Sequence, residues 1–245
     1  MQMIEGEKLR YIAPLKKWRL LDLDKLKSEG RYHGGGRGFR KLITGLEKSG
    51  VIKTTRDNQT RRKFVFLTKS GELQLGSHGS SIGINVDNFD HDSRVSIIAH
   101  ELLRFDSINE VILEHEIVGD KRIGERNPHT PDAVIAGERK GSKFNMAFEL
   151  ELTQKSSSRL KEKFRHYLDT TVYDYILYFF TSEGLLKSYK KFLNQEYGQA
   201  WKSKFMLAIN TKLLCRDFKL ENTLIEFNEK QASLGELFGK TREVP

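Results

Sequence analysis

The sequence predicts an α+β protein, α/β in its second part, made of a small basic domain and a larger domain built on a mixed sheet. A length of 245 residues suits two domains, because domains most often contain about 100–150 residues. Residues 1–76 hold 18 Lys/Arg and 8 Asp/Glu, whereas the rest of the chain is close to neutral. The apolar residues follow helical spacing at first and alternate between helical and strand spacing from residue 93 on.

The first third predicts three helices. Residues 8–18 carry an apolar stripe interrupted by Pro14, and residues 22–30 start at an aspartate cap and end at a glycine. A run of glycines at 34–36 makes a turn. A third helix is expected over residues 38–50, because its apolar residues recur at i, i+3, i+4 and i+7 and its other face is basic.

A hairpin is expected directly after the third helix. The β-rich runs 51–56 and 61–68 flank a short polar turn, and helices followed by such a wing are the layout of a winged helix-turn-helix. We expect this domain to bind double-stranded DNA, with the third helix in a major groove and the wing along phosphates. Protein contacts, or a merely solubilising basic surface, are the alternatives. The expected DNA-binding residues are Arg37, Arg40, Lys41 and Thr44 on the helix, and Arg56, Arg61, Arg62 and Lys63 on the wing.

The domain boundaries follow from composition. Residues 77–92 are rich in Gly, Ser, Asn and Asp, which is typical of a linker or an ordered crossover. The predicted organisation is therefore a DNA-binding domain over 1–76, a linker over 77–92 and a second domain over 93–245. Within the second domain the expected order is α-β-β-β-α-β followed by α-β, over residues 93–105, 109–118, 131–137, 144–153, 156–170, 173–182, 184–196 and 204–214.

Three acidic residues are expected to meet in the second domain. Asp132 follows Pro131 at the start of one strand, and Glu149 and Glu151 share a face of the next strand. Antiparallel pairing across the turn at 137–143 would bring Asp132 beside them. Clustered carboxylates repel one another unless a cation neutralises them, and hard oxygen ligands suit Mg²⁺ or Mn²⁺. The alternative is a strand whose polar face simply meets water.

These residues resemble the PD-(D/E)xK nuclease superfamily, whose core order and acidic positions match Pro131-Asp132 and Glu149-Leu150-Glu151. A second resemblance is to the replication-relaxation family of plasmids and mobile elements. It is carried by the segments PDA and FELE and by Lys163 and Tyr167, four residues apart on the following helix. The resemblance implies a restriction-endonuclease-like fold and metal-dependent phosphodiester hydrolysis. The usual lysine two residues after the strand acid is here Glu151, as in some members of the superfamily, and Lys155 and Lys163 are candidates for a displaced lysine.

Other residues compete for the site. Glu101 on the first helix matches a place where many superfamily members supply an extra ligand, and Glu116 would share a strand face with Glu114. His129 lies close to the Pro-Asp pair in the sequence, although a loop histidine is the simpler interpretation. No H-x-x-x-H or H-E-x-x-H spacing and no P-loop occur, which argues against a zinc hydrolase and against nucleotide-driven chemistry.

The predicted function is a Mg²⁺- or Mn²⁺-dependent endodeoxyribonuclease of a plasmid, phage or mobile element. The alternatives are a non-cleaving DNA-binding replication or mobilisation factor and a regulator whose second domain dimerises or senses. A homodimer would supply the two active sites that a double-strand cut takes. A single cysteine, Cys215, and the lack of an apolar run of about 18 residues predict a cytoplasmic protein without a membrane partner.

Overall fold

The computed structural model describes residues 6–76, 84, 88–118, 129–213, 215, 218–239 and 241. The chain forms two compact units, Met1–Ile97 and Ile98–Pro245, which divide within helix α6 (Phe89–Leu102). Of the expected linker 77–92, residues 77–83 and 85–87 lie outside the described residues, and 89–92 belong to α6. Within the described part of the chain, no helix has the length and hydropathy needed to cross a membrane.

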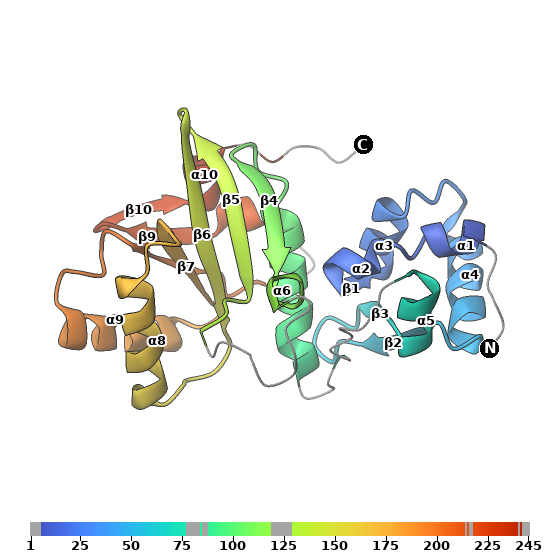
Figure 1. Cartoon of the computed structure of the whole chain (residues 1–245), viewed down its shortest axis with the longest axis horizontal. Helices are drawn as coiled ribbons and strands as arrows, with labels where there is room; N and C mark the ends of the chain where they lie inside the picture. Colours follow the sequence, from blue (N-terminus) through green and yellow to red (C-terminus); the bar gives the residue numbers. More distant parts are fainter. Residues whose placement is uncertain are drawn as a thin grey trace. The chain divides into compact units, whose positions relative to one another are not determined.

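The first unit combines short helices with a three-stranded antiparallel sheet of order β1-β3-β2 (Figure 1). The expected helix over 8–18 is in fact two helices, because the chain turns at residues 11–14. Strand β1 was not predicted. Its three residues are too few to show a period, and it forms only by pairing with β3. The elements are α1 (Gly6–Arg10), α2 (Leu15–Trp18), β1 (Leu20–Asp22), α3 (Leu23–Glu29), α4 (Gly36–Lys48), β2 (Ile52–Arg56), β3 (Lys63–Leu67) and α5 (Lys69–Gln74).

Helix α4 and the hairpin after it follow the sequence pattern closely. Phe39, Ile43 and Leu46 are buried on one face of α4, as their spacing predicts. At the hairpin turn, Asp57 Oδ1 accepts hydrogen bonds from the backbone N–H groups of Gln59 and Thr60. Its Oδ2 pairs with Arg94 Nη2 of α6 at 3.2 Å, and both side chains are almost completely buried. The hairpin turn is therefore held from within the unit.

The second unit is built on a seven-stranded mixed sheet of order β10-β9-β8-β7-β6-β5-β4. Strands β6, β7 and β8 are parallel, and the other neighbours are antiparallel. The mixed sheet and the predicted order of its core elements are confirmed. The elements are β4 (Ile108–Leu113), α7 (Glu114–Val118), β5 (Ala133–Arg139), β6 (Ser142–Glu151), α8 (Ser157–Asp169), β7 (Tyr175–Phe180), α9 (Glu183–Tyr197), β8 (Phe205–Ile209), the 3-10 helix η2 (Leu220–Asn222), β9 (Leu224–Phe227), β10 (Lys230–Ser233) and α10 (Leu234–Phe238).

Helices α8 and α9 are the crossovers between the parallel strands, and they pack on one face of the sheet (Figure 1). The core under them is strongly aromatic. Phe164 of α8 contacts the rings of Tyr178 and Phe205, and Tyr189 of α9 contacts those of Phe180 and Tyr178. Since side chains alternate along a strand, Ala147, Glu149 and Glu151 point to this same covered face. This places two carboxylates inside an aromatic layer.

Two predictions about strands in this unit were wrong. The strand expected over 109–118 ends at Leu113 and continues as α7, where Glu116 Oε2 accepts a hydrogen bond from the Leu113 N–H. Glu114 and Glu116 therefore lie on a helix and do not share a strand face. The strand expected over 204–214 ends at Ile209 and gives way to a turn. The β9–β10 hairpin was also not predicted.

Candidate functional site

The β5–β6 hairpin sets the position of the acidic residues. Lys140 and Gly141 form its two-residue turn, and both have positive φ, 50° and 79°, as such tight turns require. The register then pairs Ala133 with Phe148, so the next pair outward is Asp132 opposite Glu149. The Leu150 N–H lies beyond this pairing and donates to Asp132 Oδ2 at 2.8 Å. Asp132 is thereby fixed at the end of the hairpin beside Glu149.

Glu149 is enclosed by two residues of α8. Its Oε2 accepts a hydrogen bond from Lys163 Nζ at 2.6 Å, and its Oε1 accepts one from the Tyr167 hydroxyl. Lys163 and Tyr167 lie one helical turn apart, so both reach the same carboxylate. Glu149 is 2% exposed and Tyr167 is fully buried. The lysine that the sequence left as one of two candidates thus contacts the central acid directly.

Glu151 is less completely satisfied than Glu149. It is 3% exposed and forms a long ion pair, 3.8 Å, with Lys155 Nζ. Its buried Oε2 has no hydrogen-bond partner among the described residues. Glu149 and Glu151 are both buried, and the partly exposed Lys155 and Lys163 pair with them, so the four residues form one charged cluster.

Burial dominates the protonation of this cluster. It raises the pKa of Glu149 to about 7; Lys163 opposes the rise, and the nearby charge of Asp132 adds to it. Burial likewise raises the pKa of Glu151, against the effect of Lys155 and Lys163. For Lys163, burial acts in the opposite sense but is outweighed by Glu149 and Asp132, so its pKa is raised and the ammonium stays charged. Asp132 acts on all three groups, which places it in the same electrostatic site.

The donor set fits a divalent cation in its chemistry. Asp132, Glu149 and Glu151 offer carboxylate oxygens, which Mg²⁺ and Mn²⁺ prefer, and no described residue donates a hydrogen bond to Glu151 Oε2. As the side chains stand, no three Asp, Glu, His or Cys residues in the described ranges are arranged to hold one metal ion. Lys163 occupies the position beside Glu149 that a shared cation would use. A cation at Glu149 would therefore either share this carboxylate with Lys163 or displace the lysine.

The other proposed ligands have partners elsewhere. Glu101 pairs with Arg104 at 2.7 Å and lies 3.9 Å from His100 Nδ1. Glu116 accepts the hydrogen bond at the start of its own helix α7. His129 stacks on His166 of α8, with ring centroids 4.4 Å apart, and its Nε2 lies 3.6 Å from Glu162. None of these contacts joins a predicted extra ligand to the Asp132–Glu149 cluster.

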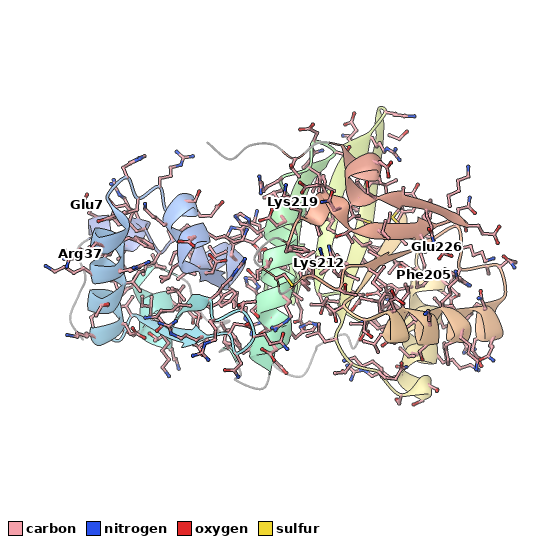
Figure 2. The ribbon with its side chains drawn as sticks, turned by 180° about the vertical axis from the view of Figure 1, so that it is seen from behind. Glu7, Arg37, Phe205, Lys212, Lys219 and Glu226 are labelled. Atoms are coloured by element: carbon pink, nitrogen blue, oxygen red, sulfur yellow. The ribbon has the colours of Figure 1, made fainter. Side chains whose placement is uncertain are left out.

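The predicted DNA-binding residues gather on α4 and the β2–β3 hairpin. Arg37, Arg40, Lys41 and Thr44 are exposed on α4, and Arg37 points away from the unit (Figure 2). A hollow of about 440 Å³ lies between α4 and the hairpin, lined by Leu23, Arg40, Ile43, Thr44, Arg56 and Lys63. Three of these six are cations, which favours an anionic ligand.

Two wing cations also have internal partners. Arg62 Nη1 lies 3.6 Å from Asp22, which caps α3, and Lys63 Nζ lies 3.6 Å from Glu47 of α4. Arg61 is exposed in a left-handed conformation, φ 59°. Arg56 is also exposed and contacts the Arg61 carbonyl. The wing therefore offers two outward cations and two that also hold the unit together.

The start of α4 presents bare backbone. Gly35 is the N-cap residue and makes no side-chain cap, and Gly36 is the first helical residue. A Cβ atom at either position would meet nothing within 4 Å, so packing does not require glycine there. Gly34 and Gly38 differ, because a Cβ atom at either would collide with the Tyr32 ring. Exposed amides at a helix N-terminus are suited to an anion such as a phosphate.

The sequence did not reveal two tyrosines of the carboxylate site. Tyr178 of β7 pairs in register with Glu149, and Tyr189 of α9 lies over it; both are fully buried. Both stand in runs that look like ordinary core in the sequence. Their available signal was the hydroxyl that each buries in a layer of mixed tyrosine and phenylalanine rings.

Comparisons with known proteins give little. No family model matches the chain, and no curated protein matches it. A solved structure titled as the restriction endonuclease FokI bound to DNA is similar at a TM-score of 0.29 and 11% identity. The match covers 85% of this chain and 43% of that one, so the chain spans less than half of the FokI chain.

Proposed function

We propose that this protein is a divalent-metal-dependent DNA endonuclease of the PD-(D/E)xK type. The observation that carries the proposal is the convergence of Asp132, Glu149 and Lys163. They come from three separate segments and meet at the end of the β5–β6 hairpin, where Lys163 contacts Glu149 at 2.6 Å and Asp132 acts electrostatically on both. Two carboxylates and a lysine in one cluster are the groups that metal-assisted phosphodiester hydrolysis requires.

Each residue has a role in this proposal. Asp132, Glu149 and Glu151 would hold Mg²⁺ or Mn²⁺, whose charge stabilises the phosphate and lowers the pKa of a bound water. Lys163 stays protonated and, once released from Glu149, donates to a phosphate oxygen. Tyr167 keeps Glu149 in place through its hydrogen bond. Lys155 is a second cation, near Glu151.

The first unit would act as a winged helix that binds double-stranded DNA. Three features support this: the exposed basic face of α4, the cation-lined hollow beside the hairpin, and the bare amides of Gly35 and Gly36. The charge surplus of residues 1–76 adds long-range attraction to a polyanion. The unit thereby supplies most of the affinity, and the carboxylate site supplies the chemistry.

Incubation with supercoiled plasmid tests the proposal. The wild-type protein should convert the plasmid to nicked or linear forms with Mg²⁺ or Mn²⁺ and leave it intact with EDTA. Asp132→Asn and Glu149→Gln should each lower the rate by at least about a hundredfold, because each removes a carboxylate that would hold the cation, and the cation stabilises the developing phosphate charge. The matched control is Glu183→Gln at an exposed position of α9, and this variant should cut at the wild-type rate.

A second candidate is a non-cleaving DNA-binding factor of replication or mobilisation, which retains the site as a structural element. The observation that favours it is the closure of Glu149, whose two oxygens are both engaged by α8. This candidate predicts DNA binding without cutting in every metal tested. Cleavage that disappears in Glu149→Gln excludes it.

A further inference from the structure

Glu149 and Glu151 differ in how completely their carboxylates are bonded. Glu149 has a lysine on one oxygen and a tyrosine hydroxyl on the other. Glu151 has the longer ion pair to Lys155, and its Oε2 lacks a hydrogen bond within the described residues. Burying an acceptor without a hydrogen-bond donor costs free energy, so we expect this oxygen to have a further partner when the site is in use.

Two buried hydroxyls near the glutamates are in the same condition: Tyr178 lies opposite Glu149 in the strand register, and Tyr189 lies near Glu151. Tyr178 and Tyr189 are fully buried, and neither hydroxyl completes a hydrogen bond among the described residues. Their ring centroids are 6.2 Å apart. Burial, and then the nearby glutamates, raise the pKa of both hydroxyls, so each keeps its proton and can act only as a donor toward a carboxylate. Tyr189 comes near enough to affect Glu151 without reaching hydrogen-bond geometry.

Packing does not explain these hydroxyls. The same layer contains Phe164, Phe180 and Phe205, which contact the two tyrosines ring to ring. A phenylalanine at 178 or 189 would fill the same volume without burying an unpaired polar atom. Two buried hydroxyl donors and a buried carboxylate oxygen that lack hydrogen-bond partners among the described residues, all in one layer, point to a use in the site.

We propose that Tyr178 and Tyr189 are positioning residues whose hydroxyls hold the Glu151 carboxylate in the orientation that binds a divalent cation. This rests on the proposed function of the carboxylate site. Glu149 already has an equivalent donor in Tyr167 of α8. Tyr178 of β7 and Tyr189 of α9 then orient Glu151 as Tyr167 of α8 orients Glu149. Each glutamate is oriented by tyrosine and paired with lysine, and the cation joins the two sets.

Binding of Mn²⁺ to the full-length protein, measured by electron paramagnetic resonance, tests this without relying on activity. Tyr178→Phe and Tyr189→Phe should each weaken Mn²⁺ binding about tenfold, the usual effect of a lost hydrogen bond to a charged group. Plasmid cleavage should then need about tenfold more Mn²⁺ to reach half its maximal rate. Urea unfolding should show neither variant less stable than the wild type, because no completed hydrogen bond is removed. The control is Tyr197→Phe, whose hydroxyl bonds the Lys161 carbonyl at the surface of α9 and should leave Mn²⁺ binding unchanged.

The outcomes separate this proposal from the one it rests on. If the wild type binds Mn²⁺ and both phenylalanine variants bind it equally well, the positioning role is overturned and the metal site stands. If Tyr197→Phe weakens binding as much as the site variants, the positioning role is also overturned, because the effect is then not specific. If the wild type neither binds Mn²⁺ nor cuts DNA, both proposals fall.

Discussion

The two units of this protein place their charged side chains in opposite environments. In the first, Arg37, Arg40 and Lys41 stand on the exposed face of α4, where water solvates them at little cost. In the second, Glu149 is buried and pairs with the partly buried Lys163 of α8. Exposed charges act on a partner through their number and spacing, whereas buried charges act through specific neighbours. The neighbours of a buried charge are therefore as informative as the charge itself.

The largest expected effect comes from removing a partner of the buried pair. Lys163→Met leaves the Glu149 charge buried with less compensation, so the free energy of unfolding should fall by about 3 kcal/mol in urea denaturation. The exposed counterpart, Arg37→Met on α4, should change it by no more than about 0.5 kcal/mol. Equal effects of the two substitutions would mean that burial does not distinguish the two units as we describe.

The pH dependence of stability sharpens the same contrast. Because the pKa of Glu149 is raised from 4.5 to about 7, the folded state binds this proton more tightly than the unfolded state does. The resulting stability is fully present below pH 4.5 and is lost as the pH rises to about 7. The unfolding free energy of the wild type minus that of Glu149→Gln should therefore decrease over this range, by up to about 3 kcal/mol. A difference that stays constant with pH would contradict the burial of an ionisable Glu149.

The salt dependence of DNA binding should show whether the exposed cations of α4 contact phosphates. Each phosphate contact contributes roughly 0.9 to the slope of log binding constant against log salt. Replacing both Arg37 and Arg40 with alanine should reduce that slope by about two for duplex DNA, measured by fluorescence anisotropy. Lys187→Ala, at an exposed position of α9, is the control and should leave the slope unchanged. An unchanged slope in the double variant would remove α4 from the DNA interface.

The smallest effect is expected at the start of α4. Gly36→Ala meets no neighbouring atom and favours the helix, so it should stabilise the protein by a few tenths of a kcal/mol. It should nevertheless weaken DNA binding, because the methyl group separates the helix amides from a phosphate. Thermal unfolding and anisotropy measure the two effects side by side. A variant that is stabilised and binds DNA normally would show that no phosphate approaches these amides.

The sequence predicted elements best where the pattern is long and regular. Helices α8 and α9 and strand β7 begin and end within two residues of their predicted limits, because each has a continuous buried stripe or apolar run. It failed where a short segment depends on distant partners. Strand β1 exists through its pairing with β3, and α7 replaces a β-like run after Glu116 takes the Leu113 N–H.

The candidate site divides in the same way. The proximity of Asp132 and Glu149 could be predicted from the hairpin pattern, although the turn expected over 137–143 is only Lys140 and Gly141 in the structure. The nearness of Tyr178 and Tyr189 to the glutamates could not, because it depends on how β7 pairs in parallel and on how α9 lies over it. Sequence spacing alone does not determine such non-local contacts. Tyr178 and Tyr189 therefore looked like ordinary core residues.

The turn at Lys140 and Gly141 has a consequence for how this domain can change over time. One residue inserted there would slip the strand pairing by one position, and a strand slipped by one presents its other face. Glu149 and Glu151 would then exchange faces with Phe148 and Leu150, although the composition of the strand would be unaltered. A lineage can therefore vary the residues of this turn but not its length. This turn contributes no residue to the carboxylate site, but its length determines which residues of β6 face that site.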